Sequence, residues 1–277
     1  MRRRAGRPAT PVLSREIIAR AALGLIDDAG AEGFSLAALA KRLGVRPSSF
    51  YNHVDGKDDI LAAVRELVSD SIDASMFARL PWDEALIVWA HGYRDTFAAH
   101  PPAISLLATL PITGALRTLR MYDQVVSGLE RGGWPGEMII PVMVSVESFI
   151  LGSALDMVAP PDMFDSGPLS SEAPSFAAAV RARDAAAAAN GRPPADLSFE
   201  VGLAAIVDGL RCTLRALGGP PGPLGPVGPL GPLGPLGPLG SLGSLPDGTG
   251  AERAAAPLPR DITRDITRDT DLTGEPA

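Results

Sequence analysis

The polar side chains between positions 46 and 57 have the chemistry of a nucleic-acid contact. They supply hydroxyl, amide, imidazole and cationic groups. With the adjoining proline and an upstream serine, the set is Ser35, Arg46, Pro47, Ser48, Ser49, Tyr51, Asn52, His53 and Lys57. Groups of these types hydrogen-bond base edges in the major groove and the phosphate oxygens beside it. Their polarity alone fits a short solvated helix equally well, so the elements that hold them must decide.

These side chains fall on the last part of a predicted helix-turn-helix. Ser14 and Ser35 are suitable N-caps for two helices whose apolar residues recur at helical spacing. Gly44 supplies the turn, and Pro47 suits the first turn of a third helix that runs to about His53. Helix, glycine turn and short helix in this order predict a DNA-binding module.

Charge is distributed unevenly along the chain. The 277 residues carry a formal net charge of −7, which argues against a protein that coats nucleic acid generally. Residues 1–60 hold ten Lys or Arg against seven Asp or Glu, a balance of +3 that leaves −10 for the remainder. This distribution is consistent with a local DNA-binding module on an acidic body.

The rest of the globular chain predicts an all-helical body. Apolar residues form three further helical stripes: Ile60, Leu61, Val64, Leu67, Val68 and Ile72; Trp82, Leu86, Trp89, Tyr93 and Phe97; and Leu116, Leu119, Tyr122, Val126 and Leu129. Two later segments, from about Glu137 to Val158 and from Ser198 to Leu217, predict subunit-contact helices. Pro141, Glu147 and Asp156 interrupt the first segment, which favours a buried helix over a membrane span.

Residues 34–61 closely resemble the DNA-binding signature of the tetracycline-repressor (TetR) family. The match combines the turn glycine, the Tyr51-x-His53 pair, the following Lys57 and an apolar fourth helix, in that order. The resemblance implies that Pro47, Ser48 and Ser49 face the operator, that Tyr51, His53 and Lys57 contact phosphates, and that Phe50 belongs to the core of the small domain. Asn52 and Ala37 depart from common family residues, so the operator sequence cannot be carried over.

A second resemblance lies near the end of the globular part. Residues 199–210 resemble the last dimerisation helix of the tetracycline-repressor branch, with Gly202 and Gly209 allowing close helix approach. The resemblance implies a homodimer with an interface of two helices from each subunit. Two recognition helices could then enter successive major grooves on one face of the duplex.

Together these observations predict an all-α DNA-binding transcriptional regulator. The expected organisation is a basic arm at 1–13, a helix-turn-helix domain at 14–60, a helical effector-binding and dimerisation domain at 61–217, and a disordered tail at 218–277. The expected function is a cytoplasmic repressor that a small-molecule effector releases from double-stranded operator DNA. The alternative is a helical enzyme using His91, His100, Glu147 or Asp156, although no nucleophile elbow, phosphate loop or paired metal motif supports it.

An effector cavity is expected within the body. Its candidate lining residues are Trp89, Tyr93, Phe97, His100, Met121, Phe149 and Asp156, with Trp82 and Met157 as further candidates. Aromatic and methionine stripes of this kind also occur as plain core. No cofactor is expected, but His100 and Asp156 resemble the residues with which tetracycline-binding members hold a magnesium–drug chelate. The alternatives are a helix-end histidine and a solvated or capping aspartate.

The two ends of the chain have low-complexity composition. Arg2, Arg3, Arg4 and Arg7 predict an arm that follows the DNA backbone, or else an unstructured basic tail. After about Gly218 the Gly-Pro-Leu and Arg-Asp-Ile-Thr repeats predict a flexible tail rather than a collagen triple helix. The single cysteine excludes an intrachain disulfide, which fits a reducing compartment.

Overall fold

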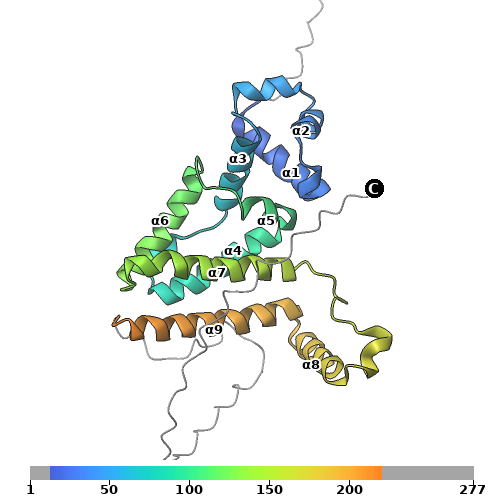
Figure 1. The fold of residues 1–277 in the computed structure, drawn as a ribbon, viewed down its shortest axis with the longest axis vertical. Helices are drawn as coiled ribbons and strands as arrows, with labels where there is room; N and C mark the ends of the chain where they lie inside the picture. The colour runs from blue at the N-terminus through green and yellow to red at the C-terminus, as the bar shows by residue number, and fades with distance from the viewer. Residues whose placement is uncertain (1–12, 220–277) are drawn as a thin grey trace, which may run out of the picture. The chain divides into compact units, whose positions relative to one another are not determined.

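The computed structural model describes residues 13–219, and throughout that range the regular structure is helical (Figure 1). The elements are α1 (Arg15–Gly33), α2 (Leu36–Leu43), η1 (Pro47–Asn52), α3 (Lys57–Ser69), η2 (Ser75–Ala78), α4 (Trp82–Ala98), α5 (Pro101–Leu107), α6 (Leu116–Arg131), α7 (Gly136–Asp156), η3 (Gly167–Ser171), α8 (Pro174–Asn190) and α9 (Pro194–Ala216). These residues lie within the first of two compact units, residues 1–234. The predicted all-α class is confirmed for the described range.

Local signals build the N-terminal head as predicted. The Ser14 hydroxyl accepts a hydrogen bond from the Ile17 amide, and the Ser35 hydroxyl accepts one from the Ala38 amide, each at 3.2 Å. Gly44 ends α2 in the left-handed conformation with φ 66°, which a residue without Cβ adopts at little cost. The helix-turn-helix order is therefore confirmed.

Two details of the head differ from the predictions. Helix α1 continues for one more turn beyond Gly30, which forms a kink with φ 73° instead of ending the helix. The third element is a 3₁₀ helix, in which the amides of Ser49 and His53 bond the carbonyls of Arg46 and Phe50 three residues earlier. Short helices commonly adopt this tighter winding.

Helix α4 lies at the centre of the body and contacts α5, α6, α7 and α9. Trp89 on α4 is completely buried and packs edge-on against Phe77 and Tyr93, with ring centroids 6.3 and 5.1 Å apart. Trp82 at the start of α4 packs edge-on against Trp134 at 5.4 Å. Aromatic pairs with this geometry stabilise the core beyond the area that they bury.

The predicted stripe on α6 was wrong in phase. Leu116 and Leu119 are exposed, whereas Met121 and Val125 are buried. Val125 lies one position before Val126 of the predicted stripe, so the buried face is rotated around the helix axis. Among the residues of the predicted stripe, only Leu129, near the end of α6, is fully buried.

Helix α7 is long and apolar enough to cross a membrane by length and composition. In the described range it instead contacts α4, α5, α6 and α9, and it lies beside α9 (Figure 1). Its opposite face leaves Ile140, Val144 and Leu155 exposed. An apolar helix that is covered on one side only needs a further partner for its other side.

Two shorter features complete the body. Helix α5 was not predicted, although Pro101 and Pro102 at its first turn are compatible with a helix start. Helix α8 contacts α9 and η3. The predicted basic arm, apart from Leu13, and the tail from Pro220 onward lie outside the described residues.

A glycine on α6 is expected to be intolerant of a side chain. A Cβ at Gly128 would lie 2.4 Å from Phe77 Cδ1 and 2.8 Å from Phe77 Cβ, inside the buried core. We therefore expect Gly128→Ala to lower the free energy of unfolding by about 1–3 kcal/mol through overpacking. Chemical denaturation measures this change.

Gly92 on α4 is the matched control, because nothing lies within 4 Å of a Cβ built there. Gly92→Ala should raise the free energy of unfolding by up to about 1 kcal/mol through higher helix propensity. Equal effects of the two substitutions would contradict the close approach of α6 to Phe77.

An ion-pair network that joins α1 to α3 is expected to make stability depend on pH. Arg15 donates to Asp59 at 2.8 Å and to Glu66 at 2.6 Å. Burial raises the pKa of both acids, but hydrogen bonds, led by those from Arg15, outweigh it and hold each pKa below its ordinary value. Groups with lowered folded-state pKa values stabilise the fold above the ordinary values of 3.8 and 4.5, and this stability is lost as pH falls through the lower folded-state values.

Removing the cation should therefore flatten the acid limb of the stability curve. We expect the melting temperature of an Arg15→Met variant to fall less steeply with acidification than that of the wild type, starting from a lower value at neutral pH. Arg42→Met removes an exposed pair with Asp28 and serves as the control, with little change in the slope. Parallel curves for Arg15→Met and the wild type would show that the network does not titrate.

Candidate nucleic-acid interface and effector cavity

The recognition element η1 presents a polar outer face on a buried anchor. Phe50 is 1% exposed and fixes η1 to the head, while Pro47, Ser48 and Asn52 are exposed and Ser49 is half-buried. The outer side chains carry hydroxyl and amide groups that can both donate and accept hydrogen bonds. This is the chemistry that reads base edges in a major groove.

The residues expected to contact phosphates flank this face. Tyr51 is 63% exposed, which is unusual for a large aromatic side chain, and His53 is exposed at the end of η1. Lys57 begins α3, and its ammonium lies 5.5 Å from the centre of the Phe34 ring, which restricts where this exposed cation can point. Arg46 is exposed just before η1. A phenol, an imidazole and two cations on one short stretch can bind several backbone phosphates.

Ser35 has a structural task that its sequence position also predicts. Its hydroxyl oxygen accepts the Ala38 amide and so caps α2, while the side chain remains at the surface. The structure therefore shows the capping role directly, and a DNA contact by Ser35 stays a prediction.

The body contains a cavity of about 360 Å³ between α3, α4, α5, α6 and α7. Its lining residues are Arg65, Ser69, Tyr93, Phe97, Leu107, Ala108, Leu110, Ile112, Thr118, Tyr122, Met143, Val144, Glu147, Ser148 and Leu151. The volume falls in the range of small-molecule sites, and the mixture of apolar walls with a few polar groups is typical of them.

A carboxylate and two phenols converge in this cavity. The hydroxyls of Tyr93 and Tyr122 both donate to Glu147 Oε1, the latter at 2.6 Å. Burial, followed by the negative charge of Glu147, raises the pKa of both tyrosines well above the ordinary value. Both phenols therefore keep their protons at neutral pH and remain hydrogen-bond donors to the carboxylate.

Arg65 links the same cavity to the head. It lies on α3, which packs against α1, and it is 8% exposed. Its Nη2 donates to the carbonyl oxygens of Leu107 and Leu110 at the end of α5, the latter at 2.6 Å. A change in the cavity that moves these carbonyls would therefore act on α3.

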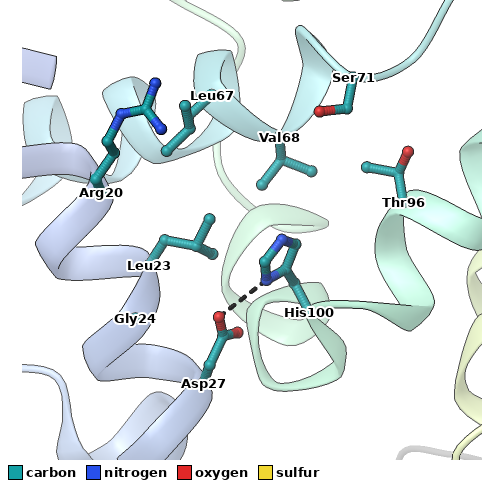
Figure 2. A pocket seen from close by; sticks show the side chains of 9 residues that line it. All are labelled: Arg20, Leu23, Gly24, Asp27, Leu67, Val68, Ser71, Thr96 and His100. Atoms are coloured by element: carbon teal, nitrogen blue, oxygen red, sulfur yellow. Dashed lines mark hydrogen bonds and ion pairs between the residues drawn. The ribbon is translucent and has the colours of Figure 1, made fainter.

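A second cavity, of about 390 Å³, lies between the head and the body (Figure 2). Arg20, Leu23 and Asp27 reach it from α1, Leu67 and Val68 from α3, and Thr96 from α4, with Ser71, Gly24 and His100 completing the lining. His100 Nδ1 lies 2.9 Å from Asp27 Oδ2, and this contact links the junction of α4 and α5 to α1. The contact therefore joins the body to the head.

Two family models match the chain, one over each part. The model described as "Bacterial regulatory proteins, tetR family" matches residues 18–64. The model described as "Tetracyclin repressor-like, C-terminal domain" matches residues 80–214. Together they cover about two-thirds of the sequence and both parts of the described structure. The chain belongs to the TetR family.

Curated relatives and solved structures agree with this assignment. The tetracycline repressor protein class A from transposon 1721, from Escherichia coli, is 29% identical over 75% of this chain and 96% of its own length. An uncharacterized helix-turn-helix transcriptional regulator of Mycobacterium tuberculosis is 38% identical over 37% of this chain and 48% of its own. For three curated relatives, the Mycobacterium tuberculosis regulator among them, the matching region spans 48–60% of the relative's own length. A crystal structure titled as a possible TetR family transcriptional regulator from Streptomyces coelicolor has a TM-score of 0.55 and 25% identity, covering 72% of this chain and all of that one.

Against this TetR-family framework, the predicted effector residues separate into two groups. Tyr93 and Phe97 line the cavity of the body. Trp89 and Met121 are buried in the core, and Phe149 stacks on Phe199 at 5.6 Å between α7 and α9. These three residues are not among those that line the cavity of the body, and a role in effector binding stays a prediction for them.

The predicted pair of His100 and Asp156 is not brought into one cavity. His100 faces Asp27 of the head, and Asp156 is half-buried at the end of α7. Among residues 13–219 no group of three or more His, Cys, Asp or Glu side chains is placed to hold a metal ion. The geometry lends the magnesium–drug chelate no support, and it stays a prediction.

Sequence reasoning missed the polar residues that give the cavity its character. The sequence marks Glu147 as an interruption of an apolar segment and as a candidate acid or base of an enzyme, but not as a residue of the effector cavity, and it gives no signal for Arg65 or Thr118. A usable signal existed for Glu147, because it is a lone acid in the middle of an otherwise apolar helical segment. Tyr122 belonged to a predicted apolar stripe, but its hydroxyl needed a partner if it was buried.

Proposed function

We propose that the protein is a homodimeric transcriptional repressor that binds operator DNA through its head and releases it when a small molecule occupies the cavity of the body. The observation that carries the proposal is the exposed polar row on and beside η1, set on a helix-turn-helix that matches the family model. Two of the curated relatives are named as repressors, and one of them is the tetracycline repressor. We assign no catalytic step to the chain, and we place its action in the cytoplasm.

Exposed apolar surface supports dimerisation. Helices α7 and α9 lie side by side, and Ile140, Val144 and Leu155 on α7 and Val201 on α9 are exposed. A second copy of the same two helices would cover them in a symmetric four-helix interface. Two heads spaced about 34 Å apart could then bind successive major grooves.

The cavity contacts support a route from effector to DNA. Arg65 reaches the cavity from α3, and α3 packs against α1 of the head. His100 and Asp27 add a second connection between body and head. A ligand that binds the cavity more tightly when the head is in one position than in another couples the cavity to the DNA-binding site. A coupling free energy of about 1–3 kcal/mol changes operator affinity roughly 5- to 150-fold.

A binding titration tests the proposal. Fluorescence anisotropy would compare the full chain on its own upstream DNA and on a scrambled duplex of equal length, at two salt concentrations. We expect selective binding that weakens as salt rises, because phosphate contacts release counterions. Equal binding to both duplexes would contradict the proposal unless a genome-wide selection of bound fragments recovers a specific site elsewhere. Sedimentation of the same sample would show whether the chain is a dimer.

A further inference from the structure

Glu147 offers the cavity one unoccupied hydrogen-bond acceptor. Both tyrosine hydroxyls donate to its Oε1, and within residues 13–219 its Oε2 makes no hydrogen bond and is not sealed from solvent. An ionised carboxylate accepts several hydrogen bonds, so half of its capacity is available to a ligand. The carboxylate lies in the middle of α7, where the two phenols hold it in place.

Most of the other polar side chains that line the cavity form hydrogen bonds with one another or with the backbone. Each phenol has a single proton, and Tyr93 and Tyr122 direct theirs at Oε1. Ser69 and Thr118 hydrogen-bond one another at 2.9 Å. Arg65 is the cation among the lining residues, and its Nη2 bonds the two carbonyls at the end of α5. Among the lining residues Glu147 is the acid, and its Oε2 is an acceptor without a hydrogen bond in the described range.

The remaining walls are mainly apolar. They include Phe97, Leu107, Ile112, Met143 and Leu151. Such walls favour a hydrophobic ligand body, while a partly buried carboxylate favours a charged donor over a neutral one. A negatively charged ligand group that lies beside Glu147 would be repelled by the carboxylate.

We propose that the cavity takes a protonated amine on an apolar body, with the ammonium group donating to Glu147 Oε2. This inference rests on the proposed effector function and names the chemical class of the effector. Tyr93 and Tyr122 act as positioning residues, because they fix the carboxylate and do not offer protons to the ligand. The bound amine would contact Glu147 on α7, and its apolar body would contact the cavity walls that α3, α4, α5 and α6 contribute.

Three probes with one ring system and different charges test the proposal. They are tryptamine, the neutral N-acetyltryptamine and the anionic indolepropionate, each titrated calorimetrically into the full chain. We expect tryptamine to bind about tenfold more tightly than the neutral probe, as one charge-assisted hydrogen bond implies, and the anion to bind most weakly.

A Glu147→Gln variant tests the assigned atom. The glutamine carbonyl can still accept from both tyrosines, but its amide group places a donor where Oε2 was. We expect the preference for tryptamine to disappear while N-acetyltryptamine binds as before, which would show that the cavity remains folded. Glu137→Gln, an exposed position on the same helix, is the matched control and should retain the preference.

The outcomes separate this inference from the proposed function. Equal affinity for the three probes, preference for the anion, no binding of any probe to the wild type, or an unchanged preference in Glu147→Gln would each overturn it. Operator binding in the absence of probe is measured separately. Selective operator binding together with a failed probe series would leave the repressor function standing with a different effector class.

Discussion

Replacing Asp83 by alanine is expected to lower the free energy of unfolding by about 3 kcal/mol, among the largest effects of any single substitution in the body. Asp83 is 1% exposed in the first turn of α4. It accepts from Arg211 of α9 through Nε at 2.7 Å and Nη2 at 2.6 Å. Without the carboxylate, the guanidinium keeps only part of its charge compensation in a site largely shielded from water.

One feature places the expected value at the lower end of the range for broken buried pairs. Arg211 also contacts Asp208 at 2.9 Å, so some compensation survives. The opposite contribution is smaller: Asp83 interacts favourably with the amino end of α4, and the variant loses this interaction as well. Burial lowers the pKa of Arg211, but in the wild type the hydrogen bonds to Asp83 and Asp208 outweigh it and raise that pKa. An arginine side chain keeps its proton in proteins, so the guanidinium remains charged in the variant.

Asp208→Ala is the matched control within the same network. Its side chain is 48% exposed, and an exposed pair contributes about 1 kcal/mol or less. Both variants should be compared with the wild type by denaturant unfolding at one protomer concentration, because a dimer gains stability with concentration. Similar losses for the two variants would show that burial does not distinguish them and that Asp83 is not the main anchor of α9.

The features that the sequence predicts well are those set within a few residues. The caps at Ser14 and Ser35 and the left-handed Gly44 each depend on one side chain and its nearest backbone groups. Helices α4 and α6 also begin at Trp82 and Leu116, the first residues of the two predicted stripes. Local chemistry of this kind is present before any tertiary contact forms.

The features that the sequence did not predict depend on which neighbours arrive. On α6 two adjacent stripes satisfy helical spacing, and packing against Phe77 and the other body helices selects the one through Met121 and Val125. Helix α5 has only seven residues, too few for periodicity to stand out. Its start immediately after His100 helps to explain why that histidine meets Asp27 of the head instead of the effector cavity.

The candidate sites show the same division. The polar row of η1 is continuous in sequence, so its residue types, together with the helix-turn-helix order and the family signature around them, were enough to predict it. Glu147, Tyr93 and Tyr122 come from three different helices, and their convergence depends on the rotation of each helix about its axis. Periodicity fixes such a rotation only to within about one residue, which moves a side chain by roughly 100° around a helix.

A Tyr51→Ala, Lys57→Ala double variant is expected to bind operator at least about 100-fold more weakly than the wild type. Both side chains are exposed, so their removal creates no cavity in the head. Each dimer would lose a lysine–phosphate contact and a phenol–phosphate contact in both heads. Two charge-assisted hydrogen bonds, each contributing at least about 1.5 kcal/mol, already account for a factor of this size.

The salt dependence of binding gives a more specific signature than the affinity alone. Each Lys57 that neutralises a phosphate releases about one counterion, so the slope of log affinity against log salt should become shallower by about two for the dimer. Tyr51→Ala alone should weaken binding with little change in that slope, because tyrosine is uncharged at neutral pH. Arg181→Ala removes one exposed positive charge from α8 and is the control, with affinity and slope close to those of the wild type.

The double variant also distinguishes a DNA-binding head from a head that only mediates protein contacts. Exposure of Tyr51 and Lys57 fits both kinds of head, but only phosphate contacts make the salt slope depend on Lys57. If the double variant kept both operator affinity and salt slope, these residues would not contact phosphates. If it lost affinity with an unchanged slope, Tyr51 would contribute the contact and Lys57 would not, so the DNA would lie closer to η1 than to the start of α3.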